Sequence, residues 1–146
     1  MGILKVKRLH PKAELPQRAT EHSAGYDLCA CIVNPMAIPQ GGRVMIPTGI
    51  AIEIGRPDVA GFVFGRSGLG LRHGIVPANA VGVIDADYRG EIIVALTNHS
   101  TKTYWVQPGE RIAQLVLLPV FTPPVEECDT LTETERGTGG FGSSGR

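Results

Sequence analysis

The segment Glu91-Ile92-Ile93-Val94-Ala95-Leu96-Thr97 is a run of β-branched and aliphatic residues bounded by turn residues. Three other stretches are similarly apolar or alternate between apolar and polar positions: residues 46–54, 59–64 and 112–120. Nineteen glycines and eleven prolines are spread between such stretches. Short runs with a period of two and frequent turn residues are typical of strands in a sandwich or barrel. The sequence therefore predicts an all-β domain, a barrel or sandwich made of many short strands.

Two regions depart from this pattern. Ser67–His73 is predicted to form one short helix, with Ser67 as its cap, and two internal glycines limit it to a turn or two. From about residue 122 the chain changes to Pro123-Pro124, an acidic stretch and a Gly-rich end that cannot fold alone. We therefore expect a β domain over residues 1–121 and a flexible C-terminal arm over residues 122–146.

Length and charge limit the functions that the chain can have. Its 146 residues fit one domain, and 14 Lys and Arg balance 14 Asp and Glu. This balance argues against a general nucleic-acid binder, although a few local donors can hold a phosphate chain. Neither a signal peptide nor a membrane-spanning run is expected. The odd number of cysteines, three, then indicates reduced thiols in a cytoplasmic protein.

Several common catalytic and metal-binding patterns are absent from the sequence. There is no P-loop, and residues 137–142 match the dinucleotide fingerprint only at the C-terminus, with no helix to follow. Ser67 and Ser144 both lack the glycine two residues later that a nucleophile elbow needs. Cys29-x-Cys31 and the four histidines do not have zinc-ligand spacing.

Five segments, in their order and spacing, closely resemble the five motifs of the trimeric dUTPases, the deoxyuridine triphosphate nucleotidohydrolases. They are Ala24-Gly25-Tyr26-Asp27-Leu28, Gly65-Arg66-Ser67-Gly68-Leu69-Gly70, Asn79 with residues 82–90, Gly109-Glu110-Arg111-Ile112-Ala113-Gln114-Leu115 and the Gly-rich tail. The resemblance covers the chain from about Leu15 to its end. It implies the dUTPase-like β-clip fold, a distorted jelly-roll or β-barrel-like subunit that forms a homotrimer. It also implies hydrolysis of dUTP to dUMP and diphosphate, which lowers dUTP and supplies dUMP for thymidylate synthesis.

Asp85 follows the apolar pair Val83-Ile84, in an expected hairpin whose return strand begins at Glu91. A carboxylate at a strand end can orient a water molecule and accept its proton. Asp85 and Asp87 also fit a plain hairpin turn, where aspartate is common. The resemblance implies that Asp85 is the base that directs water at the α-phosphorus, because the family places its catalytic carboxylate directly after a Gly-x-Ile triplet. Asp87 is the second choice.

Arg66, Ser67 and Gly68 are the candidates for phosphate binding. The planar guanidinium suits phosphate oxygens, and the serine with the following amides can form an anion-binding turn. By itself the segment also fits a surface turn with a solvated arginine; the resemblance implies that it holds the α- and β-phosphates. Gln114, a polar residue within an apolar strand, must bond a neighbouring strand or touch the phosphate region. Asp27 is expected to orient Arg66 or metal-bound water.

The nucleoside is expected to bind around Tyr88. By itself this aromatic residue also fits core packing at a strand start. The resemblance implies that its ring packs on the deoxyribose and leaves no space for a 2′-hydroxyl. It further implies that uracil is read by main-chain groups around Val83, Ile84 and Ile93, with the amide of Asn79. Sites that read polar groups in this way can discriminate by about 10⁴–10⁵ against a mismatched analogue.

The arm offers groups that could cover a nucleotide. Phe141 can stack on a base, and Arg136, Gly142 and Ser143 can cover a γ-phosphate, although the composition also fits a flexible tail. The resemblance implies an arm that closes over a neighbouring subunit's active site. Mg²⁺ is expected to bind through the phosphates and water, with no direct protein ligand.

Two alternative functions stay open. A deoxycytidine triphosphate deaminase would share the fold, but such enzymes typically read Pro-Gly-Phe where this chain has Ala86-Asp87-Tyr88. A non-catalytic β-domain that serves as a binding module would need none of this chemistry.

Overall fold

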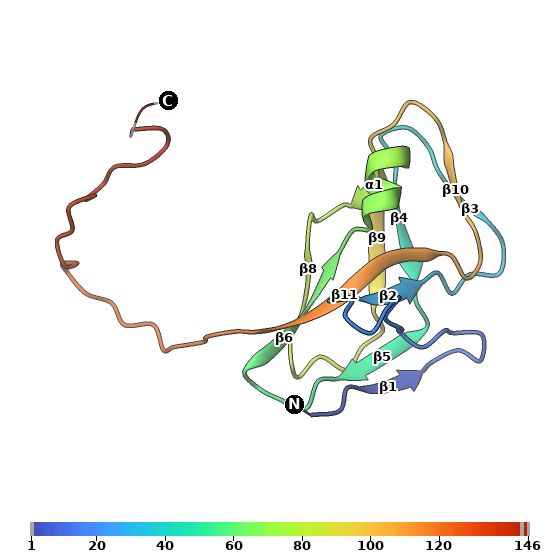
Figure 1. Cartoon of the computed structure of the whole chain (residues 1–146), viewed down its shortest axis with the longest axis horizontal. Coiled ribbons are helices and arrows are strands. Elements are labelled where there is room, and N and C mark those ends of the chain that lie inside the picture. Colours follow the sequence, from blue (N-terminus) through green and yellow to red (C-terminus); the bar gives the residue numbers. More distant parts are fainter. Residues whose placement is uncertain (1, 144, 146) are drawn as a thin grey trace.

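The computed structural model describes residues 2–143 and 145 and is strand-rich, which confirms the predicted all-β class. In the described part of the chain there are eleven strands and one helix (Figure 1). In chain order they are β1 (Lys5–Arg8), β2 (Tyr26–Cys29), β3 (Met36–Ile38), β4 (Arg43–Pro47), β5 (Ile50–Glu53), β6 (Val59–Phe64), α1 (Ser67–His73), β7 (Ile75–Pro77), β8 (Gly82–Ile84), β9 (Ile93–Asn98), β10 (Tyr104–Val106) and β11 (Arg111–Pro119).

The strands form four small antiparallel sheets. Their orders are β2-β11-β6-β8, β4-β9-β7, β1-β5 and β10-β3. The longest strand, β11, pairs with β2 on one side and with β6 on the other, so it lies at the centre of the largest sheet. Each of these sheets is open rather than closed on itself, so the structure is jelly-roll-like and not a closed barrel.

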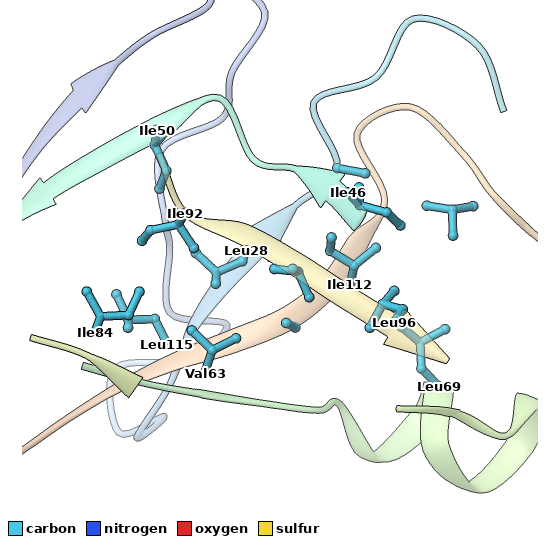
Figure 2. Close-up of a cluster of buried hydrophobic side chains, with 14 of the residues drawn as sticks. Leu28, Ile46, Ile50, Val63, Leu69, Ile84, Ile92, Leu96, Ile112 and Leu115 are labelled. Atoms are coloured by element: carbon cyan, nitrogen blue, oxygen red, sulfur yellow. The ribbon is translucent and has the colours of Figure 1, made fainter. Parts of the chain in front are cut away.

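One core joins the sheets. Figure 2 shows side chains from β2, β4, β5, β6, β8, β9, β11 and α1 that meet in one buried cluster, which contains Leu28, Ile46, Ile50, Val63, Leu69, Ile84, Ile92, Leu96, Ile112 and Leu115. Most are β-branched or leucine, residues that pack well on a pleated surface. Ile84, directly before Asp85, belongs to this cluster, so the end of β8 is anchored in the core.

Residues 46–54, which the sequence pattern groups as one stretch, belong to two strands. The chain turns at Thr48-Gly49, where Gly49 has φ +68° and the Thr48 hydroxyl donates to the Ile92 carbonyl at 2.5 Å. After the turn, Ile50, Ala51 and Ile52 are all buried. The alternation of apolar and polar residues therefore misses that β5 is covered on both faces.

The predicted hairpin between Val83 and Glu91 is wrong. β8 pairs with β6, whereas β9 begins only at Ile93 and pairs with β4 and β7. Residues 85–92 thus carry the chain from one sheet to another. Apolar periodicity identifies both strands, but it holds no information about which strand each one pairs with.

Residues 121–138 are all exposed, and the segment after Pro119 extends away from the sheets (Figure 1). The division at residue 121 stays a prediction, and positions 1, 144 and 146 of the two predicted ranges lie outside the described residues. Among the described residues, no helix is long and apolar enough to cross a membrane.

The buried side chain of Asn98 forms hydrogen bonds that hold the loop before β10. Its amide nitrogen donates to the carbonyls of Ile38 and Lys102, and its oxygen accepts from the Ser100 amide, each at 2.8 Å. Asn98→Ala leaves these buried groups unpaired, so we expect the free energy of unfolding to fall by about 2–3 kcal/mol in urea titrations. The exposed Asn34→Ala is the control, and equal losses for the two variants would contradict this role.

Candidate functional site

A cavity of about 340 Å³ lies beside β8, a volume within the range of small-molecule sites. Six of the residues that the sequence singles out line it together: Asn79, Val83, Ile84, Asp85, Tyr88 and Ile93. The other lining residues are Met45, Val63, Pro77, Gly82, Glu91, Ile92, Val94 and Ala95. Met45, Val83, Tyr88 and Ile93 are large apolar residues that nevertheless stay 45–67% exposed. The cavity therefore offers an apolar wall with a few polar groups, as a planar ring requires.

Asp85 stands at the rim of this cavity, exposed, on a turn that is closed by its own hydrogen bonds. The Tyr88 amide donates to the Asp85 carbonyl at 3.1 Å. The Arg89 guanidinium donates to the carbonyls of Ala86 and Tyr88 at 2.8 and 3.0 Å. Among the described residues, Arg89 forms no ion pair with Asp85 or Asp87, and no side chain donates a hydrogen bond to the Asp85 carboxylate, which is therefore open to a water molecule.

The Tyr88 ring is held in one place. Its hydroxyl donates to the Glu91 carbonyl at 2.9 Å, and the ring lies against Gly90, where an added Cβ would stand 2.4 Å from the phenol oxygen. Glycine at position 90 is thus required for this close approach. The ring forms a fixed wall of the cavity next to Asp85.

Asn79 reaches the cavity from a strained turn. Ala80 has φ 62°, a left-handed conformation that is uncommon for a residue with a side chain. The turn is tied by bonds from the Ala80 amide to the Pro77 carbonyl (3.1 Å) and from the Val81 amide to the Asn79 carbonyl (2.7 Å). Backbone strain of this kind tends to be found where a side chain must be presented to a ligand.

Arg66 belongs to a second cluster, around Asp27. The Arg66 Nε donates to one Asp27 oxygen at 3.0 Å, and the Arg111 Nη1 donates to the other at 3.2 Å. Asp27 therefore fixes both guanidinium groups. Helix α1 begins directly after Arg66, which is its N-cap residue but makes no side-chain cap bond, so the prediction that Ser67 caps the helix is wrong. Ser67 and Gly68 are exposed in the first turn.

Gln114 ties this cluster to the strands. Its amide donates to the Gly65 carbonyl at 2.9 Å, one residue before Arg66. Gly25 makes room for it, because a Cβ there would lie 2.4 Å from the Gln114 oxygen. Two of the segments quoted from the sequence thus have a structural role in setting the position of Arg66.

A second hollow, of about 420 Å³, lies beside α1. It is lined by Arg66, Gly68, Leu69, Arg72, His73, Tyr104, Gly109, Glu110 and Arg111. Burial and a hydrogen bond to the Glu110 carboxylate raise the pKa of Tyr104 to about 12, so the phenol keeps its proton at neutral pH. Close by on β2, burial and the neighbouring Glu14 and Asp27 charges raise the pKa of the Cys29 thiol to about 11. This thiol is therefore neutral and a poor nucleophile.

The two clusters lie at opposite ends of β6. Ile84 pairs with Gly61 near the start of β6, whereas Arg66 lies two residues beyond the last residue of that strand, Phe64 (Figure 1). Five residues of extended chain separate positions 61 and 66, about 16 Å at 3.3 Å per residue. The residues lining the first cavity and those lining the second hollow do not overlap. One chain therefore does not bring Arg66, Ser67 and Gly68 to Asp85.

The arm residues are not brought to the cavity either. Arg136 bonds the Gly139 carbonyl within the arm at 2.8 Å. Phe141 is fully exposed with φ 54°, and Gly142 and Ser143 are exposed beside it. Among the described residues, no group of three or more His, Cys, Asp or Glu side chains is placed to hold a metal ion.

Sequence reasoning missed Met45 and Arg111. Met45 reaches the cavity because β4 pairs with β9, which places it opposite Ala95, and nothing local in the sequence signals that pairing. Arg111 could have been noticed, because it is a second arginine within a segment already singled out.

Comparisons with known proteins find similarity to one family. The sequence model of the family described as dUTPase matches residues 11–145. A deoxyuridine 5'-triphosphate nucleotidohydrolase of Psychromonas ingrahamii is 49% identical over 150 residues, covering 100% of this chain and 99% of the relative. One from Idiomarina loihiensis is 48% identical over 139 residues, covering 95% and 92%.

Solved structures show the same similarity. The dUTPase of Staphylococcus bacteriophage 80alpha with dUPNHPP has a TM-score of 0.90 and 28% identity, covering 100% of both chains. The dUTPase of phage phi11 of S. aureus, described with a structural Mg(II) ion, has a TM-score of 0.81. Its 23% identity makes this a likeness of fold alone.

The fit of Gly25 against Gln114 can be tested directly. We expect Gly25→Ala to lower the free energy of unfolding by about 1–3 kcal/mol through overpacking. Gln114→Ala in the same chain should recover part of that loss. The control is Gly68→Ala, since nothing lies within 4 Å of a Cβ at this position, and it should not destabilise the helix. Additive losses from Gly25→Ala and Gln114→Ala would contradict the contact.

Proposed function

Because this chain belongs to the dUTPase family, we propose that it hydrolyses dUTP to dUMP and diphosphate in the cavity beside β8. The observation that carries this proposal is the gathering of Asn79, Tyr88 and Asp85 around one apolar cavity. The amide of Asn79 suits the base, and the aromatic ring of Tyr88 suits the sugar. The exposed carboxylate of Asp85 suits the attacking water.

The base is read by the free edge of β8. This strand is the last in its sheet and pairs only with β6, so its other edge presents main-chain donors and acceptors to the cavity. Uracil offers acceptor, donor and acceptor groups along one edge, which a strand edge and the Asn79 amide can match. Cytosine has an amine, a donor, in place of one of these acceptors, so a buried donor of the site would face another donor and be left unpaired.

The sugar is selected by Tyr88. Its ring lies against Gly90 and its hydroxyl donates to the Glu91 carbonyl, which hold the ring at the cavity. A deoxyribose packs on such a wall, whereas a 2′-hydroxyl would need the space that the ring occupies. This wall therefore excludes ribonucleotides by steric contact.

Asp85 acts as the general base. Its carboxylate accepts a proton from water while the water oxygen forms a bond to the α-phosphorus. The bond from the α-phosphorus to the bridging oxygen of the β-phosphate breaks, and that oxygen leaves with the diphosphate. Asp87 lies beyond the cavity lining, which supports the choice of Asp85.

The phosphates require a second copy of the chain. Arg66, Ser67 and Gly68 lie too far from Asp85 within one chain, at the other end of β6. We propose a homotrimer in which these residues of one subunit, with Arg66 held by Asp27, face the cavity of the next. A third contribution comes from the arm, with Phe141 over the base and Arg136, Gly142 and Ser143 over the γ-phosphate. Closing the arm excludes other water molecules.

Mg²⁺ fits this site as a phosphate-bound ion. A triphosphate carries about four negative charges, and Mg²⁺ commonly binds through phosphate oxygens and water with few protein ligands. When bound, it would neutralise charge on the phosphates. The three free cysteines support the proposal that the enzyme works in the reducing cytoplasm.

Asp85→Asn keeps the shape of the side chain and removes the base. We expect kcat for diphosphate release from dUTP to fall by about 10²–10⁴-fold with little change in KM. Asp87→Asn is the matched control and should retain most of the activity. Near-wild-type rates for Asp85→Asn, or conversion of dCTP to dUTP without dUMP, would contradict the proposed reaction.

A mixing experiment tests the shared site. Asp85→Asn chains and Arg66→Ala chains, each weakly active, are unfolded together and refolded in equal amounts. If each site takes Asp85 and Arg66 from different copies, about a quarter of the mixed sites are intact and activity returns. If both residues come from one chain, the mixture shows only the mean of the two residual rates.

A further inference from the structure

Arg72 is a cation without a partner in the hollow beside α1. The two other arginines of the hollow, Arg66 and Arg111, share the Asp27 carboxylate. The Glu110 carboxylate is occupied by the Tyr104 hydroxyl and the Gln107 amide. Arg72 is exposed and makes no hydrogen bond or ion pair with the residues that the structure describes. The hollow therefore presents one free positive charge, with His73 beside it.

The arm carries the opposite charge. Residues 122–146 contain two basic and five acidic residues, whereas the rest of the chain contains twelve basic and nine acidic ones. The five acidic residues of the arm all precede Arg136: Glu126, Glu127, Asp129, Glu133 and Glu135. All five are exposed, and none forms an ion pair within the described part of the chain. The arm extends away from its own sheets (Figure 1), so the described residues of the same chain offer these carboxylates no basic partner.

The distance between Arg136 and Glu133 in the arm is similar to the distance between Ser67 and Arg72 along α1. On the proposed function, Arg136 lies over phosphates bound at Arg66, Ser67 and Gly68, and two of these residues, Arg66 and Gly68, line the hollow together with Arg72. Glu133 lies three residues earlier, within about 10 Å of extended chain. Along α1, Arg72 lies five residues after Ser67, about 7.5 Å at 1.5 Å per residue. The phosphates would repel the carboxylates of Glu133 and Glu135, whereas Arg72 in the hollow is a cation that these carboxylates can reach.

We propose that the hollow beside α1 binds Glu133 and Glu135 of a neighbouring subunit's arm, with Arg72 as their charge partner. This contact rests on the proposed function, because it requires that Arg136 reach the phosphates. Exposed ion pairs are weak and screened by salt, which suits an arm that must close and reopen in each catalytic cycle. The contact positions the arm and takes no part in the reaction.

Charge reversal tests the proposal in the full-length enzyme with dUTP and Mg²⁺. We expect Arg72→Glu, and separately Glu133→Lys with Glu135→Lys, to raise KM about 3- to 10-fold at low salt while kcat changes less than about twofold. Combining the reversals should restore KM, a rescue that a general structural defect would not show. High salt should remove the difference between the variants and the wild type.

The controls carry the same changes of charge elsewhere. Lys7→Glu reverses an exposed charge on β1, which pairs with β5 and does not line the hollow, and Glu126→Lys with Glu127→Lys reverses carboxylates about ten residues from Arg136. Effects of these controls as large as those of the test variants, or no rescue on combining the reversals, would overturn the proposal. Another result would also overturn the proposal. If inorganic diphosphate inhibits Arg72→Glu more weakly than the wild type while KM is unchanged, the hollow binds diphosphate and not the arm. Hydrolysis of saturating dUTP by the wild-type chain tests the proposed function separately.

Discussion

The antiparallel pairing of β8 with β6 is the constraint on which the site depends. Because Ile84 lies opposite Gly61, Asp85 leaves the sheet near the start of β6, while Arg66 follows the end of the same strand. Hydrogen bonds between the strands fix this register. The side chains of Ile84 and Val63, one from each strand, pack in the core and hold it in place (Figure 2). A slip by one residue would turn Ile84 to solvent, so the separation of the two functional groups is as stable as the core itself.

This separation has an electrostatic consequence. If Asp85 and Arg66 met within one chain, they would form an ion pair, and each would need to be released before it could act on a substrate. Instead, Arg66 is held by Asp27, and the carboxylate of Asp85 lies free at the rim of an apolar cavity. In the proposed homotrimer, assembly would bring the base and the phosphate-binding groups together across a nucleotide. Each of the two groups is positioned separately. The hydrogen-bonded turn after β8 positions Asp85, and Gln114 and Asp27 position Arg66.

Many elements of the fold could be predicted from local sequence, whereas the residues of the site could not. The β-branched runs became β9 and β11, and Ser67–His73 became the only helix of the described chain. Strand pairing was not visible in the same way, so the expected hairpin after Val83 was wrong and Met45 was missed. Pairing is a contact between residues distant in sequence, which periodicity does not encode. Asp85 by itself is an ordinary turn aspartate; the resemblance across five segments selected it, and the structure adds its position beside Tyr88 and Asn79.

The central claim is that one catalytic site takes its base and its phosphate-binding groups from two copies of the chain. A crystal structure of the assembled enzyme with Mg²⁺ and a non-hydrolysable dUTP analogue measures this most directly. We expect Asp85 and Tyr88 of one subunit, and Arg66 and Ser67 of a neighbour, to contact the same nucleotide. A nucleotide held by Asp85 and Arg66 of a single subunit would contradict the claim.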